Sequence, residues 1–211
     1  MDSALFDQSY WLGGGTCCGK STVAAQLSRR FGLQHVKRTD DARLYDDRVS
    51  PVDHPAATEF LAHKRRLLEG GVTLIDDPLP LDMVAQAFRE FWALALEDVR
   101  NAPPQLPTLY EGTRMPPDAV LPILPDPRCA AWLAPSIDVL RTRLRERDSV
   151  GRWAPGVEPE DALERLTQMF YDFSEALAQL AETHGGVVLR CEAVEDRDGL
   201  ADRVASSFGL L

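Results

Sequence analysis

The chain has 211 residues, of which 45% are hydrophobic and 27% charged, and this suits one α/β domain with a substantial core. Its formal net charge is −10, which disfavours duplex nucleic acid as a main partner because an acidic surface repels a phosphate backbone. No apolar run approaches the roughly 20 residues that a membrane-spanning helix needs, so we expect no membrane partner.

Strand-like and helix-like patterns alternate along the chain. The predicted elements of the first half are a strand at 9–13, a helix at 20–31, a strand at 33–38, a loop at 42–57, a helix at 58–71 and an amphipathic helix at 81–101. Those of the second half are a strand at 108–113, a strand at 129–136, an arginine-rich helix from 137, a long helix at 160–184, a strand at 187–193 and a helix at 198–209. This alternation predicts a mainly parallel sheet covered by helices on both faces.

The segment between the first strand and the first helix matches the phosphate-binding pattern G-x-x-x-x-G-K-[ST] through Gly14, Gly19, Lys20 and Ser21. Glycines allow the backbone to wrap a phosphate with its N–H groups pointing inward, and the helix adds its positive N-terminal end. In this pattern Lys20 reaches the β- and γ-phosphates and the Ser21 hydroxyl binds Mg²⁺. The residues that we expect to line the nucleotide phosphates are Gly14, Gly15, Thr16, Cys17, Cys18, Gly19, Lys20, Ser21 and Thr22.

The cysteines give no metal-binding or disulfide pattern. No C-x-x-C spacing occurs among the four cysteines, which are Cys17, Cys18, Cys129 and Cys191. The N-terminus also has no basic segment typical of a signal peptide. We therefore expect a reduced, cytoplasmic protein. Cys17 and Cys18 occupy variable positions of the loop, where the backbone binds the phosphate. A redox role for this pair is a lesser hypothesis, which nucleotide binding by the oxidised protein would contradict.

Other classes of nucleotide-binding protein fit less well. The G-x-G-x-x-G spacing of a dinucleotide fold is not met. An N-K-x-D base-reading motif and an LSGGQ motif are also absent, which argues against Ras-like GTPases and ABC ATPases. The chain instead resembles the small P-loop kinases, a group that includes nucleoside monophosphate kinase-like, shikimate, gluconate and chloramphenicol phosphotransferase relatives. The stretches that carry the resemblance are GGGTCCGKST at 13–22, RTDD at 38–41, YEGT at 110–113 and WLAPSIDVLRTRLRERD at 132–148.

The resemblance implies a three-layer P-loop fold over 1–211, with a five-stranded parallel sheet in the order 2-3-1-4-5. It also implies a helical acceptor-binding insert at about 42–107 and an arginine-bearing lid at about 141–160. The acceptor hydroxyl would be oriented or deprotonated by Asp40 or Asp41, directly or through Mg²⁺, so that Asp40 is also a candidate on the metal side.

The resemblance assigns further roles near the third strand and in the lid. Glu111 would lie near the metal or the acceptor, Gly112 would let the acceptor approach the backbone, and Arg114 would hold an anionic or polar acceptor. The lid arginines that would clamp the transferring phosphoryl group are, in order of preference, Arg147 and Arg152, then Arg143.

A second segment competes for the acidic role. Residues 72–77, VTLIDD, have the generic form of a buried strand followed by two acids, so that Asp76 and Asp77 would replace Glu111 near Mg²⁺. We prefer the strand at 108–113, because it leads more directly to the strand at 129–136 and leaves 81–101 as part of the insert.

Together these observations predict an ATP- and Mg²⁺-dependent phosphotransferase that moves the γ-phosphoryl group to a small-molecule acceptor. The acceptor could be a hydroxylated metabolite, a nucleoside or nucleotide, or an antibiotic. The alternatives are a nucleotide-binding sensor or assembly protein without an acceptor, and a simple nucleoside triphosphate hydrolase.

Overall fold

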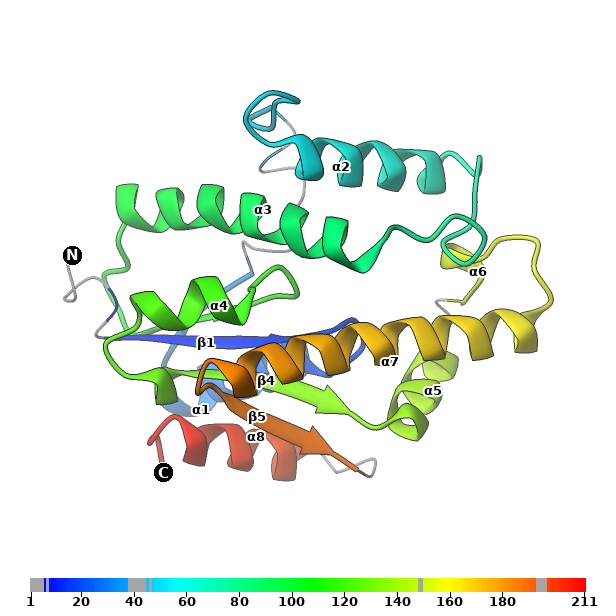
Figure 1. Ribbon diagram of the computed structural model, residues 1–211. Coiled ribbons are helices and arrows are strands. Elements are labelled where there is room, and N and C mark those ends of the chain that lie inside the picture. Colours follow the sequence, from blue (N-terminus) through cyan, green and yellow to red (C-terminus); the bar gives the residue numbers. More distant parts are fainter. Residues whose placement is uncertain (1–5, 7, 38–44, 46, 148–149, 193–196) are drawn as a thin grey trace.

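The sheet of the protein has five parallel strands, flanked by helices on both faces (Figure 1). The computed structural model describes residues 6, 8–37, 45, 47–147, 150–192 and 197–211. The strands are β1 (Ser9–Gly14), β2 (Gln34–Val36), β3 (Thr108–Glu111), β4 (Ala130–Pro135) and β5 (Val187–Cys191). Their order across the sheet is β2-β3-β1-β4-β5, so the predicted three-layer P-loop fold with the order 2-3-1-4-5 is confirmed.

Successive residues of the central strands point to opposite faces of the sheet and build two separate cores. Leu12, Leu109 and Leu133 pack on the face covered by α1 (Lys20–Phe31) and α8 (Arg197–Ser207). Trp11 and Trp132 pack on the other face. Because both faces are covered by helices, the central strands β1 and β4 are almost entirely buried along their length.

The helices of the second face come from three parts of the chain. They are α3 (Leu81–Asn101), the short α4 (Pro117–Val120) and the long α7 (Pro159–Thr183). Figure 1 shows α7 running along the sheet, with α8 on the opposite side. α5 (Ile137–Glu146) packs against α7, and the short α6 (Val150–Trp153) lies between them in the chain.

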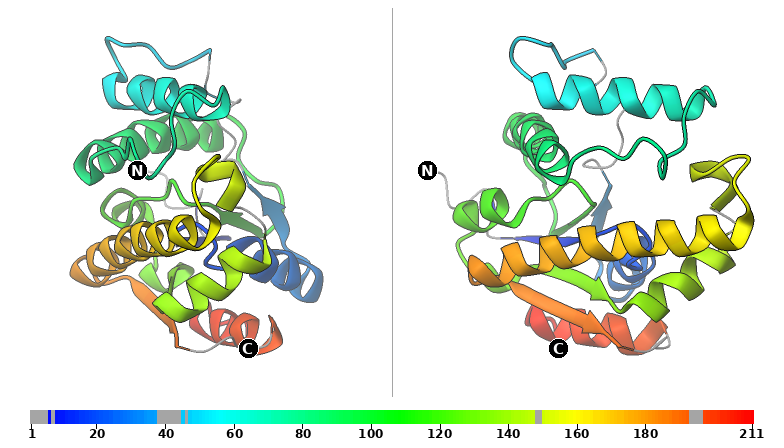
Figure 2. Two further views of the ribbon diagram at one scale, coloured as in Figure 1. Left: turned by 90° about the vertical axis from the view of Figure 1, so that its right-hand side faces the viewer. Right: turned by 45° about the vertical axis from the view of Figure 1, so that its right-hand side comes forward.

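The two helices between β2 and β3 form a helical layer whose inner helix, α3, contacts the sheet. Here α2 (Pro55–Leu68) packs on α3, which separates α2 from the sheet (Figure 2). Aromatic side chains dominate this contact: Phe60 lies against Phe88 and Phe91 with ring centroids 5.6 and 5.9 Å apart. The layer therefore has its own apolar cluster.

The differences from the sequence prediction lie at helix ends and in proline-rich segments. α2 begins at Pro55 rather than at 58, because proline is favoured in the first helical turn and the buried carboxylate of Glu90 accepts the Ala57 N–H at 2.7 Å. Between 114 and 129, where no element was predicted, the chain forms α4 and two 3₁₀ turns, Leu121–Ile123 and Pro127–Cys129. Among the described helices, none is both long and apolar enough to cross a membrane.

Candidate functional site

The loop between β1 and α1 follows a path that ordinary residues rarely adopt. Gly14 has a φ of 130° and Gly19, the residue before α1, has a φ of 93°. A Cβ atom at Gly14 would lie 2.6 Å from the carbonyl oxygen of Leu133, so a side chain there would collide with β4. Cys17 also has a positive φ, 61°, which shows that the whole loop is wound tightly.

The same loop is pressed against the body of the protein. A Cβ atom at Gly13 would lie 2.3 Å from the indole of Trp132, and one at Gly15 would lie 2.1 Å from the hydroxyl of Ser174 on α7. The thiol of Cys18 points inward, 3.6 Å from the same Ser174 hydroxyl. The loop is thus held in shape from behind by β4 and α7.

The open side of the loop offers backbone donors. Within the described part of the chain, the N–H groups of residues 15–19 donate to no protein acceptor. They lie directly before α1, whose N-terminal end carries a partial positive charge. A row of amide donors before a helix N-terminus fits an anion such as the phosphates of a nucleotide.

Lys20 lies across this loop. Its side chain is 6% exposed, and its ammonium group donates to the carbonyl oxygen of Gly15 at 2.6 Å. A buried lysine keeps its charge only where acceptors surround it, so this contact holds the ammonium group at the loop. The position agrees with the role predicted for Lys20 on nucleotide phosphates.

The residues on the predicted metal side meet where three neighbouring strands end. The ammonium group of Lys37, one residue beyond β2, donates to the Ser21 hydroxyl at 2.9 Å and lies 3.4 Å from Oε1 of Glu111, at the end of β3. Glu111 is fully buried, and Nε2 of His35 approaches the same Oε1 at 3.6 Å. A cationic group therefore already lies between a hydroxyl and a carboxylate oxygen.

This arrangement fits Mg²⁺, which prefers oxygen ligands and binds proteins through one or two side chains together with substrate phosphates. Ser21 and Glu111 supply that pair of oxygen donors around one cationic position. No cluster of three or more His, Cys, Asp or Glu side chains suited to a metal occurs among the described residues. A metal here would take its remaining ligands from groups beyond Ser21 and Glu111, and the phosphates of a nucleotide are one such source.

Two of the predicted acids, Asp40 and Asp41, lie outside the described residues. Their predicted role on the acceptor therefore stays a prediction.

The competing acidic segment forms no strand. Residues 72–77 turn at the surface, and their acids have partners there. Asp76 accepts from the Thr73 hydroxyl at 2.6 Å and lies 3.5 Å from the guanidinium of Arg165. Asp77 lies 3.5 Å from His63 on α2. The strand predicted at 108–113 forms as β3 (Thr108–Glu111), and the assignment of Glu111 to the metal side stays a prediction.

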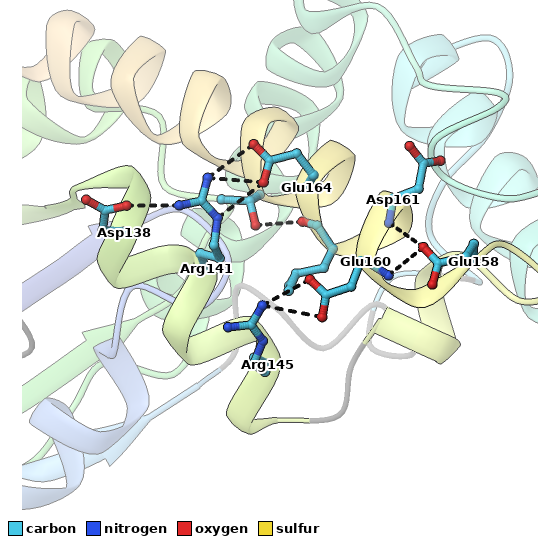
Figure 3. Close-up of polar contacts among 9 residues, drawn as sticks. Asp138, Arg141, Arg145, Glu158, Glu160, Asp161 and Glu164 are labelled. Carbon is cyan, nitrogen blue, oxygen red and sulfur yellow. Dashed lines mark hydrogen bonds and ion pairs between the residues drawn. The ribbon is translucent and has the colours of Figure 1, made fainter.

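The arginines of α5 divide between two surfaces. Arg141 pairs with Asp138 and Glu164, and Arg145 pairs with Glu160, so this face joins α5 to α7 through exposed ion pairs (Figure 3). The charged atoms of these pairs lie 2.9 Å apart for Arg141 and Asp138, 3.1 Å for Arg141 and Glu164, and 3.0 Å for Arg145 and Glu160.

The other face of α5 lies against the glycine-rich loop. Arg143 donates to the carbonyl oxygen of Cys18 at 2.9 Å, and Arg147 donates to the sulfur of Cys17 at 3.8 Å. The structure thus brings two of the three predicted lid arginines to the loop. The side chain of Arg152 lies outside the described part of the chain.

The predicted acceptor residues lie beside the helical layer. The Gly112 N–H donates to the Leu12 carbonyl oxygen at 3.2 Å, which fixes the end of β3 against β1. Arg114 is 5% exposed, and its guanidinium stacks on Phe91 at 4.1 Å and on Phe60 at 5.3 Å from the ring centroids. Arg114 therefore connects the end of β3 to α2 and α3.

Sequence reasoning missed three residues of this site. Lys37 and His35 flank the end of β2, and Ser174 supports the loop from α7. For Lys37 a signal existed: the chain has only three lysines, and this one follows a strand directly. Ser174 has no local signal, because its contact depends on where α7 packs.

The thiols of the loop are shielded. Burial raises the pKa of Cys18, an effect that the positive charge of Lys20 and the Ser174 hydrogen bond only partly offset. A protonated, buried thiol is a poor nucleophile, so Cys18 does not have the environment of a reactive cysteine.

No family model matches the chain. Similar solved structures include a protein of unknown character from Eubacterium ventriosum, with 15% identity, a TM-score of 0.46 and coverage of 96% of this chain and 98% of that chain. The protein TT1252 from Thermus thermophilus has 17% identity, a TM-score of 0.44 and coverage of 94% and 96%. A deoxyadenosine kinase from M. mycoides has 13% identity, a TM-score of 0.47 and coverage of 96% and 100%. The fold assignment itself rests on the strand order and on the β1–loop–α1 geometry, and it is the three-layer α/β fold of P-loop kinases.

Proposed function

We propose that the protein is an ATP- and Mg²⁺-dependent phosphotransferase that moves the γ-phosphoryl group of ATP to a small-molecule acceptor. The observation that carries this proposal is the loop at 14–22. Its positive φ angles, its amide N–H groups without a protein acceptor among the described residues and the buried ammonium group of Lys20 together suit a nucleoside triphosphate.

Several side chains beside the loop suit phosphoryl transfer better than nucleotide binding alone. Lys20 would hold the β- and γ-phosphates, and Arg143 and Arg147 would close over them from α5. Ser21 and Glu111 would hold Mg²⁺, which when bound neutralises charge on the phosphates and on the group being transferred. Positioning and charge stabilisation are the main contributions that a protein makes to phosphoryl transfer.

The acceptor would bind beside the end of β3, next to α2 and α3. Arg114, fixed between Phe91 and Phe60, would orient a polar or anionic group of the acceptor. Asp40 or Asp41 would orient the acceptor hydroxyl and remove its proton as the phosphoryl group arrives. In this proposal α2 and α3 form the acceptor insert, and the region around α6 forms the lid.

The thiols support a cytoplasmic location as part of this proposal. All four cysteines are free, and three of them are buried. Free thiols persist in reducing surroundings such as the cytoplasm.

The test is ADP release from Mg-ATP in the presence of pooled acceptors. The pools contain hydroxylated metabolites, nucleosides and deoxynucleosides, nucleoside monophosphates, and aminoglycoside- and phenicol-type antibiotics. Lys20→Ala is the site variant, and Arg128→Ala, which removes an exposed cation paired with Asp126 outside the site, is the control.

We expect one pool to stimulate ADP release, and Lys20→Ala to lower that rate by at least about 10²-fold, as loss of a charge that stabilises the transition state does. Arg128→Ala should act like the wild type. ADP release without any acceptor dependence would instead indicate a hydrolase. Tight ATP binding with no ADP release would indicate a sensor.

A further inference from the structure

Lys37 is the residue of the site that the proposed function leaves without a role. It is one of only three lysines in the chain, against twenty arginines. Its ammonium group lies between the Ser21 hydroxyl, at 2.9 Å, and the Glu111 carboxylate, at 3.4 Å. These are the two oxygen donors assigned above to the metal.

The topology makes this meeting specific. Lys37 follows β2, Glu111 ends β3, and Ser21 begins α1 just after the loop that follows β1. Since β2, β3 and β1 are neighbours in the sheet, their carboxyl ends bring the three side chains to one point. The contact therefore comes from the sheet itself and not from a chance approach of a surface side chain.

The burial of Glu111 explains why its contact with Lys37 is favourable. Its side chain is fully buried, and an ionised buried carboxylate needs a nearby cation. Lys37 and His35 both approach Oε1. The carboxylate is thus stabilised in the folded chain before any metal arrives.

Lys37 also differs from Lys20 in its freedom to move. The Lys37 side chain is 57% exposed, whereas Lys20 as a whole is 6% exposed. A long side chain with an exposed stem has other rotamers available in solvent, but a buried one does not. Lys37 can therefore leave its position without a rearrangement of the core.

We propose that Lys37 is a resident counter-cation of the Ser21–Glu111 pair, which a metal–nucleotide complex displaces. This inference rests on the proposed function, because it assigns the same two oxygens to Mg²⁺. In the nucleotide-free chain, Lys37 keeps the buried carboxylate compensated. It also competes with free divalent cations, so that a metal enters mainly when a nucleotide supplies its remaining ligands.

The first measurement is thermal unfolding with and without Mg²⁺, in the absence of nucleotide. We expect Lys37→Met to lower the Tm of the metal-free protein by about 2–4 °C, a shift typical for one lost favourable contact in a chain of this length. Millimolar Mg²⁺ should restore much of this loss in the variant and change the wild type little. Lys37→Arg, which keeps the charge, should resemble the wild type, and Lys64→Met controls for loss of one lysine charge.

The second measurement is Mn²⁺ binding by electron paramagnetic resonance, with the protein alone and with ADP. We expect Lys37→Met to bind Mn²⁺ about tenfold more tightly than the wild type in both conditions, because its competitor is removed. Adding Glu111→Gln to Lys37→Met should abolish that gain, which locates the metal at this carboxylate.

Equal or weaker Mn²⁺ binding by Lys37→Met would overturn the inference, as would a Tm that Mg²⁺ does not restore. Neither readout depends on phosphotransfer. A protein that binds metal as expected but transfers no phosphoryl group would contradict the proposed function alone. An active kinase in which Lys37→Met leaves metal binding unchanged would contradict this inference alone.

Discussion

The carboxyl edge of the sheet and the outer surface of α5 and α7 use the same charged residue types in different ways. On the outer surface, arginines and acids are paired directly and are largely exposed, as in the contacts of Arg141 and Arg145 with α7. At the edge of the sheet, Glu111 is fully buried and shares one oxygen between Lys37 and His35. α5 also reaches the glycine-rich loop, through Arg143 on its other face.

The difference shows how to separate functional charges from structural ones. A guanidinium that is paired with an exposed carboxylate is largely neutralised and contributes only about 0–1 kcal/mol. Arg143 binds backbone carbonyl oxygens and, within the described residues, makes no ion pair. Its net positive charge thus remains available beside the loop. A matched pair of substitutions, one in each region, tests this distinction.

The largest expected contrast is between the acids of the two regions. We expect Glu111→Gln to lower the rate of phosphotransfer by about 10²-fold, in the range observed when one stabilising group of an active site is lost. Asp76→Asn removes an exposed acid that pairs with Arg165, so its rate should stay within about twofold of the wild type. The measurement is kcat as a function of Mg²⁺ concentration for both variants.

Only Glu111→Gln should also shift the Mg²⁺ dependence to higher concentrations. Equal losses in the two variants would remove the distinction between the buried edge and the surface turn.

The arginines of α5 provide the next contrast. Arg143→Ala should lower kcat/KM by about tenfold or more, because in the proposed function it removes a positive charge beside the nucleotide phosphates, together with a contact that holds the loop. Arg141→Ala breaks ion pairs with Asp138 and Glu164 only, so we expect a change of less than twofold in kcat/KM. The free energy of unfolding of the Arg141→Ala variant should fall by about 0.2–1 kcal/mol.

Steady-state kinetics and chemical denaturation of both variants separate these effects. A reversal, in which Arg141→Ala loses activity and Arg143→Ala does not, would place the transferring group on the other face of α5.

A third contrast compares two glycines. Gly13→Ala would put a Cβ atom 2.3 Å from the buried indole of Trp132, which cannot turn away easily, so we expect a loss of about 1–3 kcal/mol of stability. Gly71→Ala, beside α2, meets its nearest neighbour at 3.5 Å and should change stability by less than about 0.5 kcal/mol.

Thermal unfolding measures both, and the expected shift is about 2–4 °C for each kcal/mol. A Gly13→Ala variant as stable as the wild type would show that the loop is not held by β4 as described.

Local patterns predicted most of the fold. The helix at 81–101 has the predicted bounds, because its apolar stripe lies between Pro80 and the Ala-Pro-Pro segment that follows. The start of α2 was missed, because the cap of its N-terminus is Glu90, which comes from another helix. Sequence patterns contain no information on a cap so far away in the chain.

The residues of the candidate site also divide into those with a local sequence signal and those whose contacts depend on distant parts of the chain. The loop at 14–22 could be found from its spacing, and the i, i+4 spacing of the α5 arginines predicted two faces. Which face meets the loop depends on how α5 packs against α7, so it needs the structure. Lys37 was missed for a similar reason, because its partners lie on two other strands that become neighbours only in the folded sheet.

The smallest expected effect concerns the thiols and again compares a buried region with a more exposed one. Burial raises the pKa of both Cys18 and Cys129, but Cys129 is only partly buried, whereas Cys18 is enclosed behind the loop. At pH 8 we therefore expect iodoacetamide to modify Cys129 first and Cys18 only after unfolding, as measured by mass spectrometry of the labelled peptides.

The raised pKa of Cys18 also sets a direction for stability. The unfolded thiol loses its proton near pH 9.0, but the folded one keeps it to higher pH. The contribution of this group to stability is thus fully present below pH 9 and is lost as the pH rises through the folded pKa. Modification of Cys18 in the folded protein as fast as Cys129 would show an accessible thiolate and would reopen the redox hypothesis for the Cys17–Cys18 pair.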